Sequence, residues 1–376
     1  MVNSREILLK LVRIAMGWEN DFSLPINVDW KEVLVLSHEQ GVNAIALDGL
    51  EVVMQNNPQF QLSTTDKLLI IEAIGGLQMV EVNNQNQLEA LKELASILHK
   101  NHIPFMVMKG FACGQYYPNP KHRPCGDIDI YPGEKYKESY QAFVDEGIVS
   151  DPYYYRHSAL FIKNVMIENH KVLGDLRGPK KQSKELEEWL KREAIKSIDT
   201  CPTATILNKE IIGAVFPSAN FNALFLPWHV SAHFAFERVT LRHLLDWALF
   251  LENDGMNIDI DAFREAKKRF TFGFSKMADI LTNLSLRFLR IPDGVIPLDI
   301  IKGALNINYE LADKVMDYMF IGKPRERDNN VWKFRWNNIK QIWKERWKYS
   351  DVFNMSMVEF ITRKSVGVIF KIGEHD

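Results

Sequence analysis

Cysteine is scarce in this sequence: 376 residues include only Cys113, Cys125 and Cys201. An odd and sparse set of thiols excludes a disulfide framework, and the spacing of these three does not match a zinc knuckle. Such a composition is typical of a reducing compartment, and we therefore expect a cytoplasmic protein.

Long hydrophobic runs are also absent from the sequence. The most apolar stretch, residues 211–236, is interrupted by Pro217 and Pro227 and contains His229 and His233, so we do not expect it to span a membrane. The first residues, MVNSREILLKLVRI, carry scattered charges and lack the apolar core and cleavage site of a secretory signal peptide.

Neither sign of charge dominates the chain. It has 46 Lys and Arg against 48 Asp and Glu, a formal net charge of −2. Because the charges balance, net charge does not indicate a particular partner. Nucleic acid is a possible ligand but is not favoured. The length allows two or three units with cores of their own. Alternating charges along residues 180–198 are expected to form the solvated face of a helix.

Basic residues do gather near the C-terminus, in residues 323–348. Large apolar side chains recur there at the spacing of one helix face: Trp332, Trp336, Ile339, Trp343 and Trp347. Aromatic and basic side chains together can bind nucleic acid or an anionic membrane. Because the stripe is regular and the chain is not basic overall, we favour an aromatic face docked on the protein itself.

The most informative segment, residues 106–131, contains Asp127 and Asp129 on a predicted strand. Ile128 and Ile130 alternate with them, which places the two carboxylates on one face and the isoleucines in the core. Residues i and i+2 of a strand lie about 6.6 Å apart, so both carboxylates can bind one divalent cation or a pair. An isolated pair of this kind is usually solvated, but the whole segment favours a metal site.

A turn at Lys109-Gly110 precedes this strand, and Arg123 lies between the turn and the strand. The backbone amides of a glycine turn and of a helix start can bind phosphate oxygens. Lysine and arginine add charge-assisted hydrogen bonds. These three residues are therefore candidates for binding the phosphates of a nucleotide.

A histidine-rich segment follows between residues 227 and 252. His229 and His233 have the i,i+4 spacing of two zinc ligands on a helix, and His243 comes later. Val230 stands where a metalloprotease helix has its glutamate, which excludes that class. The simpler interpretation is that these histidines are packed and hydrogen-bonded among helices.

Several short motifs occur in order: Lys109-Gly110, Tyr117-Pro118, Arg123 and Gly126-Asp127-Ile128-Asp129. With this order and spacing the chain resembles the bacterial family of uncharacterised nucleotidyltransferases, within the superfamily of the polymerase-beta type. Phe111 stands where better-characterised members of the superfamily have Ser or Gly. The resemblance covers about residues 65–350, with strong motifs in residues 105–170 and 228–246.

The resemblance implies an α+β fold. A mixed-sheet catalytic core at residues 103–206 is expected between an N-terminal helical region, 1–102, and a C-terminal helical domain, 207–376. A long helix should end near His102 and lead into the first strand of the core, with Gly75-Gly76 as a candidate kink.

Transferases of this type need a third carboxylate on a neighbouring strand. Residues 153–162 and 165–172 are predicted to form a hairpin around Lys163-Asn164. Alternation places Glu168 and His170 on one face of its second strand, which makes Glu168 the candidate and Asp175 the reserve. The alternative is the polar outer face of an edge hairpin.

By resemblance, Asp127, Asp129 and Glu168 would hold Mg²⁺ or Mn²⁺. His170 matches the family's strand in which a glutamate precedes a histidine by two, and is expected to contact the nucleotide. His233 and Asp246 match positions where the helical domain would close over the nucleotide.

The implied function is metal-dependent transfer of a nucleoside monophosphate from a nucleoside triphosphate, such as ATP, to a hydroxyl-bearing acceptor. The acceptor is a small molecule, a protein or RNA. Two alternatives stay open. One is a catalytically silent binding protein of the same fold, and the other is a metal-dependent hydrolase built on His229, His233, His243 and Asp246.

Overall fold

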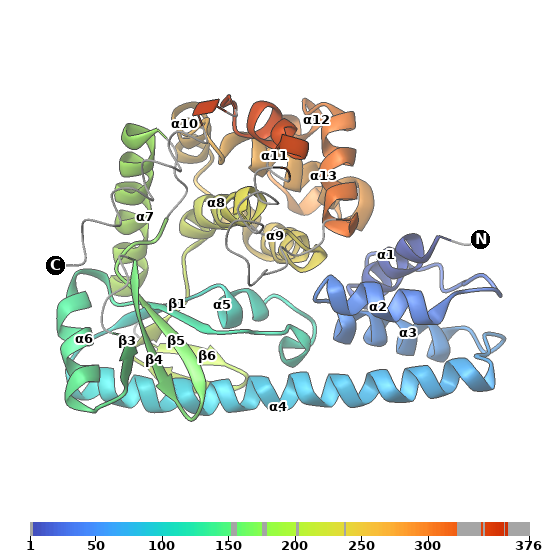
Figure 1. Ribbon diagram of the computed structural model, residues 1–376, viewed down its shortest axis with the longest axis horizontal. Coiled ribbons are helices and arrows are strands. Elements are labelled where there is room, and N and C mark those ends of the chain that lie inside the picture. The colour runs from blue at the N-terminus through green and yellow to red at the C-terminus, as the bar shows by residue number, and fades with distance from the viewer. Residues whose placement is uncertain are drawn as a thin grey trace.

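The computed structural model describes residues 3–151, 156–174, 179–200, 203–236, 238–321, 340, 343–356 and 358–359. These residues form a mixed α+β structure in which helices flank a central sheet, as the sequence predicts (Figure 1). No helix among them is long and apolar enough to cross a bilayer.

The N-terminal region is helical, as predicted. Side chains of Asn3, Asp29 and Ser63 cap three of its helices by accepting a hydrogen bond from a backbone N–H in the first turn. The helices are α1 (Ser4–Ala15), α2 (Trp30–Glu39), α3 (Asn43–Asn56) and α4 (Thr64–Lys100).

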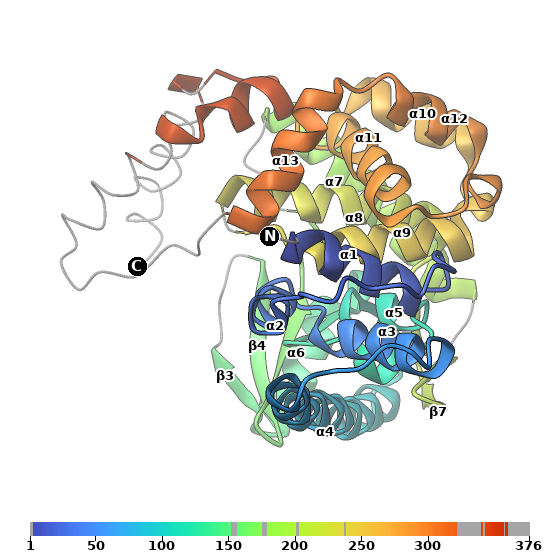
Figure 2. The ribbon, with the colours of Figure 1, turned by 90° about the vertical axis from the view of Figure 1, so that its right-hand side faces the viewer.

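Helix α4 is a single element of 37 residues that Gly75 and Gly76 do not divide. It runs along the base of the molecule in Figure 1 and is seen end-on in Figure 2. Helices α2 and α3 pack against its N-terminal half. Leu88, Leu91 and Leu94 of its C-terminal half lie in the core beneath the sheet. One rod therefore connects the N-terminal helices to the sheet.

The central sheet has six strands in the order β3-β4-β5-β2-β1-β8. The pairs β2/β5 and β1/β8 are parallel and the other neighbours are antiparallel. The strands are β1 (Phe105–Met108), β2 (Ile128–Tyr131), β3 (Val149–Asp151), β4 (His157–Ile162), β5 (Val165–His170) and β8 (Ala214–Val215). The sheet separates two cores. Phe105 and Val107 face the core that includes α4, whereas Met106 and Met108 face the core of the C-terminal helices.

The predicted hairpin is confirmed by β4 and β5. Lys163 and Asn164 both have positive φ, 51° and 65°, as a two-residue turn of this kind requires. A second hairpin, β6 (Thr203–Ile206) with β7 (Lys209–Ile212), turns in the same way at Leu207 and Asn208.

Strands β7 and β8 lie in the segment after residue 206 that we expected to be helical, so that expectation is wrong for residues 209–215. The remaining long helices match the predicted pattern, and α7 confirms the predicted helix at residues 180–198. They are α6 (Tyr136–Asp145), α7 (Lys180–Thr200), α8 (Ala219–Phe236), α9 (Leu241–Asp254), α10 (Ile260–Arg269), α11 (Ser275–Leu284), α12 (Leu298–Leu305) and α13 (Tyr309–Ile321).

Several short elements complete the chain. Helix α5 (Gly110–Gly114) follows β1. Single 3-10 turns form at Pro120–His122, Gly133–Lys135, Gly255–Asn257 and Asp293–Val295, and π turns at Ser285–Leu289 and Lys348–Val352.

Part of the predicted aromatic stripe can be checked. Trp332, Trp336 and Ile339 lie outside the described residues. Trp347 packs edge-on against Phe234 at 5.7 Å between ring centroids, whereas Trp343 is 58% exposed. The docked interpretation therefore holds for one tryptophan and not for the other.

Candidate active site

The sheet register brings the three predicted acids together. In the parallel pair of β2 with β5, Asp129 lies opposite Glu168, and Asp127 precedes Asp129 by two residues. Each carboxylate offers an oxygen, and the three oxygens lie within 4.8 Å of one another. Two neighbouring strands thus place three acids in one cluster.

Asp129 is the centre of this cluster and is only 2% exposed. Its Oδ1 atom lies 2.6 Å from Lys109 Nζ and 2.8 Å from His170 Nε2. Burial alone would raise the pKa of Asp129, but the charge of Lys109 and the hydrogen bond from His170 lower it below its usual range. Asp129 is therefore ionised.

His170, predicted to contact the nucleotide, contacts the carboxylates. Its Nε2 atom also lies 3.2 Å from Glu168 Oε2. Burial works against protonation, but hydrogen bonds to Asp129 and Glu168 raise the pKa of His170 to about 9. His157, which the sequence did not single out, lies 3.4 Å from Glu168 Oε1.

The other two acids of the cluster, Asp127 and Glu168, have different environments. Burial and the neighbouring charge of Asp129 raise the pKa of Asp127. Burial would also raise the pKa of Glu168, but the hydrogen bond from His170 outweighs it and lowers the value. Three converging carboxylates are hard oxygen ligands, which fit Mg²⁺ or Mn²⁺.

The turn between β1 and α5 aims Lys109 at the cluster. Lys109 adopts φ 48° and ψ −121°, a conformation that side chains rarely occupy and that costs on the order of 1–3 kcal/mol. Gly110 begins α5, and a Cβ atom there would lie 3.5 Å from Cys125 Sγ, which is ordinary contact. Backbone strain of this kind is concentrated at functional sites, where it holds a side chain in one fixed orientation.

Arg123 and Asp246, both predicted to contact the nucleotide, bind each other. Arg123 Nε donates to Asp246 Oδ1 at 2.9 Å and Nη2 donates to Oδ2 at 2.8 Å. Tyr117 Oη also donates to Oδ1 at 2.7 Å. All three residues are buried. This network ties the loop before β2 to α9, and contact of Arg123 or Asp246 with a nucleotide stays a prediction.

Three amide side chains of α4 hold the same loop, and no sequence motif singles them out. Asn83 Nδ2 donates to the carbonyl oxygen of Cys125 at 3.0 Å. Asn84 Nδ2 donates to the carbonyl oxygens of residues 121 and 123, and Gln87 Nε2 to those of residues 125 and 126. We call Asn83, Asn84 and Gln87 the amide clamp. The only sequence signal is a run of amides in a long helix.

A pocket of about 160 Å³ separates the cluster from the C-terminal helices. Lys109, Asp127 and Asp129 line one side, and the other side includes His229, His233, Arg242, His243 and Asp246 from α8 and α9. Folding therefore brings predicted nucleotide-contacting residues from two parts of the chain to one cavity. Asp175, the reserve acid, lies outside the described residues.

The histidines of this pocket form a hydrogen-bonded group. His229 Nε2 and His233 Nε2 lie 3.1 Å apart, so one donates to the other. His243 Nδ1 accepts the backbone N–H of Thr240, which places the hydrogen of a neutral ring on Nε2. A metal on either nitrogen of His243 would displace this capping bond. Ligand nitrogens of His229, His233 and His243 also lie within 4.8 Å of one another, so the geometry fits both a packed histidine group and the metal site of the alternative hydrolase.

Burial lowers the pKa of His229 and His243 well below the ordinary 6.5. The charge of Lys109 and the neighbouring His233 and His170 lower the pKa of His229 further, and His233, Arg242 and Arg123 act in the same direction on His243. Both rings are therefore neutral in the folded protein.

We expect the free energy of unfolding to fall as the pH drops below 6.5, because the unfolded chain then binds protons that the folded chain does not. The slope reaches up to about 1.4 kcal/mol per pH unit for each histidine. Urea unfolding at a series of pH values measures it. His229→Gln should reduce the slope, whereas His38→Gln, at an exposed site on α2, should not. Equal slopes in all three proteins would contradict the assignment.

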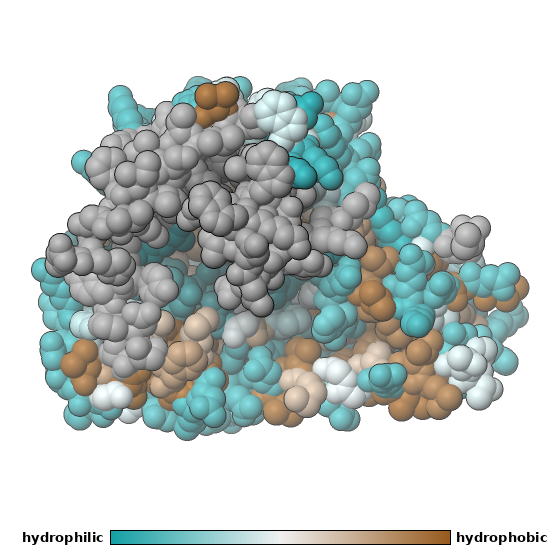
Figure 3. Space-filling model, viewed as in Figure 1, coloured by the Kyte–Doolittle hydropathy of each residue, from teal (hydrophilic) through white to brown (hydrophobic). Residues whose placement is uncertain are grey.

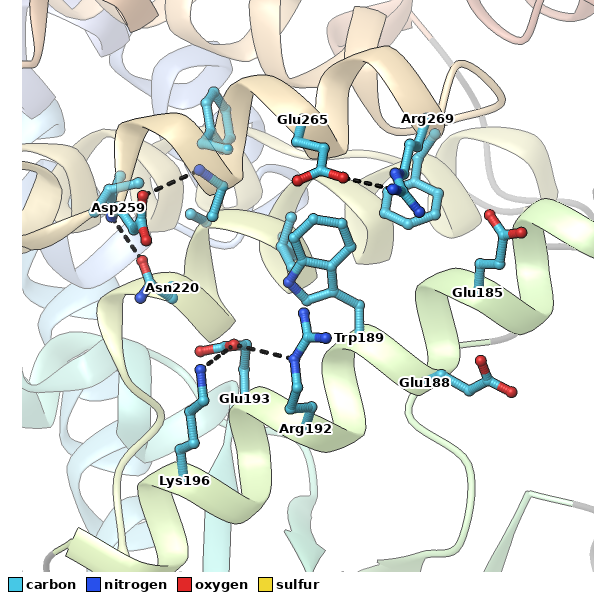
Figure 4. A pocket seen from close by; sticks show the side chains of 16 residues that line it. Glu185, Glu188, Trp189, Arg192, Glu193, Lys196, Asn220, Asp259, Glu265 and Arg269 are labelled. Carbon is cyan, nitrogen blue, oxygen red and sulfur yellow. Dashed lines mark hydrogen bonds and ion pairs between the residues drawn. The ribbon is translucent and has the colours of Figure 1, made fainter.

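A second pocket, of about 460 Å³, lies between α7, α8 and α10 (Figure 4). Trp189 points into it and meets the ring of Phe270 edge-on at 5.6 Å. Its glutamates pair with a cation of their own helix: Glu185 with Lys181, Glu188 with Lys184, Glu193 with Lys196 and Glu265 with Arg269. These charges match a solvated helix face and need no ligand.

Comparison with known protein families gives one match. The model of a family described as uncharacterised nucleotidyltransferase matches residues 27–273, which include the acidic cluster and the histidine pocket. No curated protein and no solved structure matches the chain. With about two thirds of its length matched, the chain belongs to this family of uncharacterised nucleotidyltransferases.

Proposed function

We propose that the protein transfers a nucleoside monophosphate from a nucleoside triphosphate to a hydroxyl-bearing acceptor, with Mg²⁺ or Mn²⁺ held by Asp127, Asp129 and Glu168. One observation carries the proposal: Asp127, Asp129 and Glu168 offer oxygens within 4.8 Å of one another, beside a pocket that the two aspartates line. Family membership supports nucleotidyl transfer in general. The intact set of acids favours an enzyme over a silent binding protein.

When bound, the divalent cation supplies charge neutralisation for the phosphates. Lys109 adds a positive charge at the edge of the pocket and keeps Asp129 in one orientation through its 2.6 Å contact. His170 bridges Asp129 and Glu168 and so fixes the separation of the two strands' carboxylates. The pocket residues of α8 and α9 close the opposite side.

In the proposed reaction the acceptor oxygen attacks the α-phosphorus. A new P–O bond forms, the bond to the β-phosphate bridging oxygen breaks, and pyrophosphate leaves. The hydroxyl proton passes to Glu168, which also lies 3.4 Å from His157 Nε2.

The experiment compares two labels. The protein is incubated with each triphosphate labelled at the α- or the γ-phosphate, with Mg²⁺ or with a chelator, and with protein, RNA and small-molecule fractions of a cell extract. Label from the α-position alone should enter a product, and only with the cation present. Transfer of the γ-label would show phosphoryl transfer instead, and the proposal would fail.

Glu168→Gln should reduce α-label transfer by at least about a hundredfold, equivalent to about 2.7 kcal/mol, because it removes a metal ligand and the proton acceptor. The matched control is Glu310→Gln, an exposed site on α13, which should retain full activity. Asp175→Asn should have a mild effect. The reverse order, with Asp175→Asn inactive and Glu168→Gln active, would move the third acid away from β5.

A further inference from the structure

The N-terminal half of α4 exposes a row of large apolar side chains. Leu68, Ile71, Met79 and Val82 are 64%, 64%, 68% and 52% exposed, and Ile74 on the flank is 43% exposed. Figure 3 shows hydrophobic residues along the lower edge of the molecule, over α4. Soluble proteins rarely leave so many neighbouring apolar side chains in water without a partner.

Leu68, Ile71, Gly75, Met79 and Val82, which we call the α4 stripe, lie within an arc of about 80° at 100° per residue and span about 21 Å. Their spacing is three, four, four and three residues, so it reads the same from either end. A second α4 that runs antiparallel, with a two-fold axis at Gly75, would place Leu68 opposite Val82 and Ile71 opposite Met79.

Two consecutive glycines at the middle of the stripe have no role in packing against the described residues. A Cβ atom at Gly75 or at Gly76 would meet nothing within 4 Å. Glycine inside a helix is unfavourable relative to alanine. A helix that crosses at this point explains the glycines, because they let two backbones approach closely.

The charges of α4 distinguish the candidate partners. The stripe itself has no charged residue, so two copies would not repel one another at the axis. Lys67 is the only basic residue of α4 before Lys92, whereas Asp66, Glu72 and Glu81 are acidic. An anionic membrane surface is therefore a poor partner, while a second, identical stripe is self-complementary.

We propose that α4 is the interface of a homodimer in which two α4 helices cross antiparallel at Gly75, with the α4 stripes in contact. Such an interface is isologous, as most two-fold dimers are. The exposed apolar side chains of both copies make up the central part of the interface of about 1,000 Å² that a specific contact needs. This inference is independent of the proposed function.

The first test is the mass of the full chain in solution, measured by sedimentation across a concentration series. The wild-type chain should sediment at twice the chain mass, and Ile71→Arg should raise the dimer dissociation constant at least about a hundredfold. Leu298→Arg, at a 70% exposed apolar site on α12, should leave the dimer intact. A monomeric wild-type chain at all concentrations would overturn the proposal. So would monomer that floats with phosphatidylcholine–phosphatidylglycerol vesicles.

Cysteine cross-linking tests the register of the two helices in the dimer. Gly75→Cys should form a disulfide-linked dimer, because the two copies of residue 75 meet at the axis. Leu68→Cys alone should not, since its two copies would lie about 21 Å apart along the helices, but a mixture of Leu68→Cys and Val82→Cys should. Efficient self-linking of Leu68→Cys without linking of Gly75→Cys would overturn the antiparallel crossing.

Discussion

Asp127→Asn is expected to abolish α-label transfer, by at least about a thousandfold or about 4 kcal/mol of transition-state stabilisation. The amide removes an anionic ligand from the cluster of Asp127, Asp129 and Glu168. Stability should hardly change or should rise, because burial and the charge of Asp129 already disfavour ionisation of Asp127. Activity and a melting curve, measured on the same sample, check both parts.

Asp129→Asn separates metal binding from folding. It should be equally inactive, but it should also unfold more easily, because the buried Asp129 binds both Lys109 and His170. Removing one partner of a buried ion pair typically costs about 3–5 kcal/mol. If Asp127→Asn retained full activity, the metal assignment would be wrong, whatever the behaviour of Asp129→Asn.

Asp246→Ala is expected to destabilise the protein by about 3–5 kcal/mol, because it leaves the guanidinium of Arg123 buried without its carboxylate. Tyr117 loses its acceptor in the same change. Urea unfolding measures the effect. The control is Asp299→Asn, which removes one of the two carboxylate partners of the half-exposed Arg264 and should cost less than about 1 kcal/mol.

A double variant distinguishes the roles of this buried pair. Arg123→Met combined with Asp246→Leu should recover most of the lost stability, because apolar side chains of similar size replace a buried ion pair at little cost. Triphosphate affinity is measured alongside by calorimetric titration. Unchanged stability of Asp246→Ala with lost affinity would instead assign Asp246 to the nucleotide.

Part of the acidic cluster was predictable because it follows local rules. Alternation indicates a shared face for Asp127 and Asp129, and another for Glu168 and His170 on β5. The pairing of β2 with β5 that joins the two sets is not local, and the family resemblance implied it. The second hairpin was missed because its turn uses Leu207 at positive φ, a residue that rarely adopts this conformation.

Partners distant in the sequence could not be predicted in the same way. The carboxylate that binds Arg123 comes from α9, and the amide clamp comes from α4, and no periodicity links either to the loop before β2. His170 illustrates the same limit. Its place on β5 was predicted, but its contacts with two carboxylates depend on how β2 and β5 pair.

The parallel pairing of β2 with β5 has a consequence for how the acidic cluster assembles. Parallel neighbours cannot be joined by a tight turn, and here α6, β3 and β4 intervene in the chain. Ordering that connection costs conformational entropy, and the contacts between β2 and β5 offset this cost only after they have formed. If α4 and the β4–β5 hairpin have formed but β2 and β5 have not yet paired, Glu168 is still separated from Asp129. The proposed cation site is therefore complete only once β2 and β5 have paired, and the same pairing brings His170 next to Asp129.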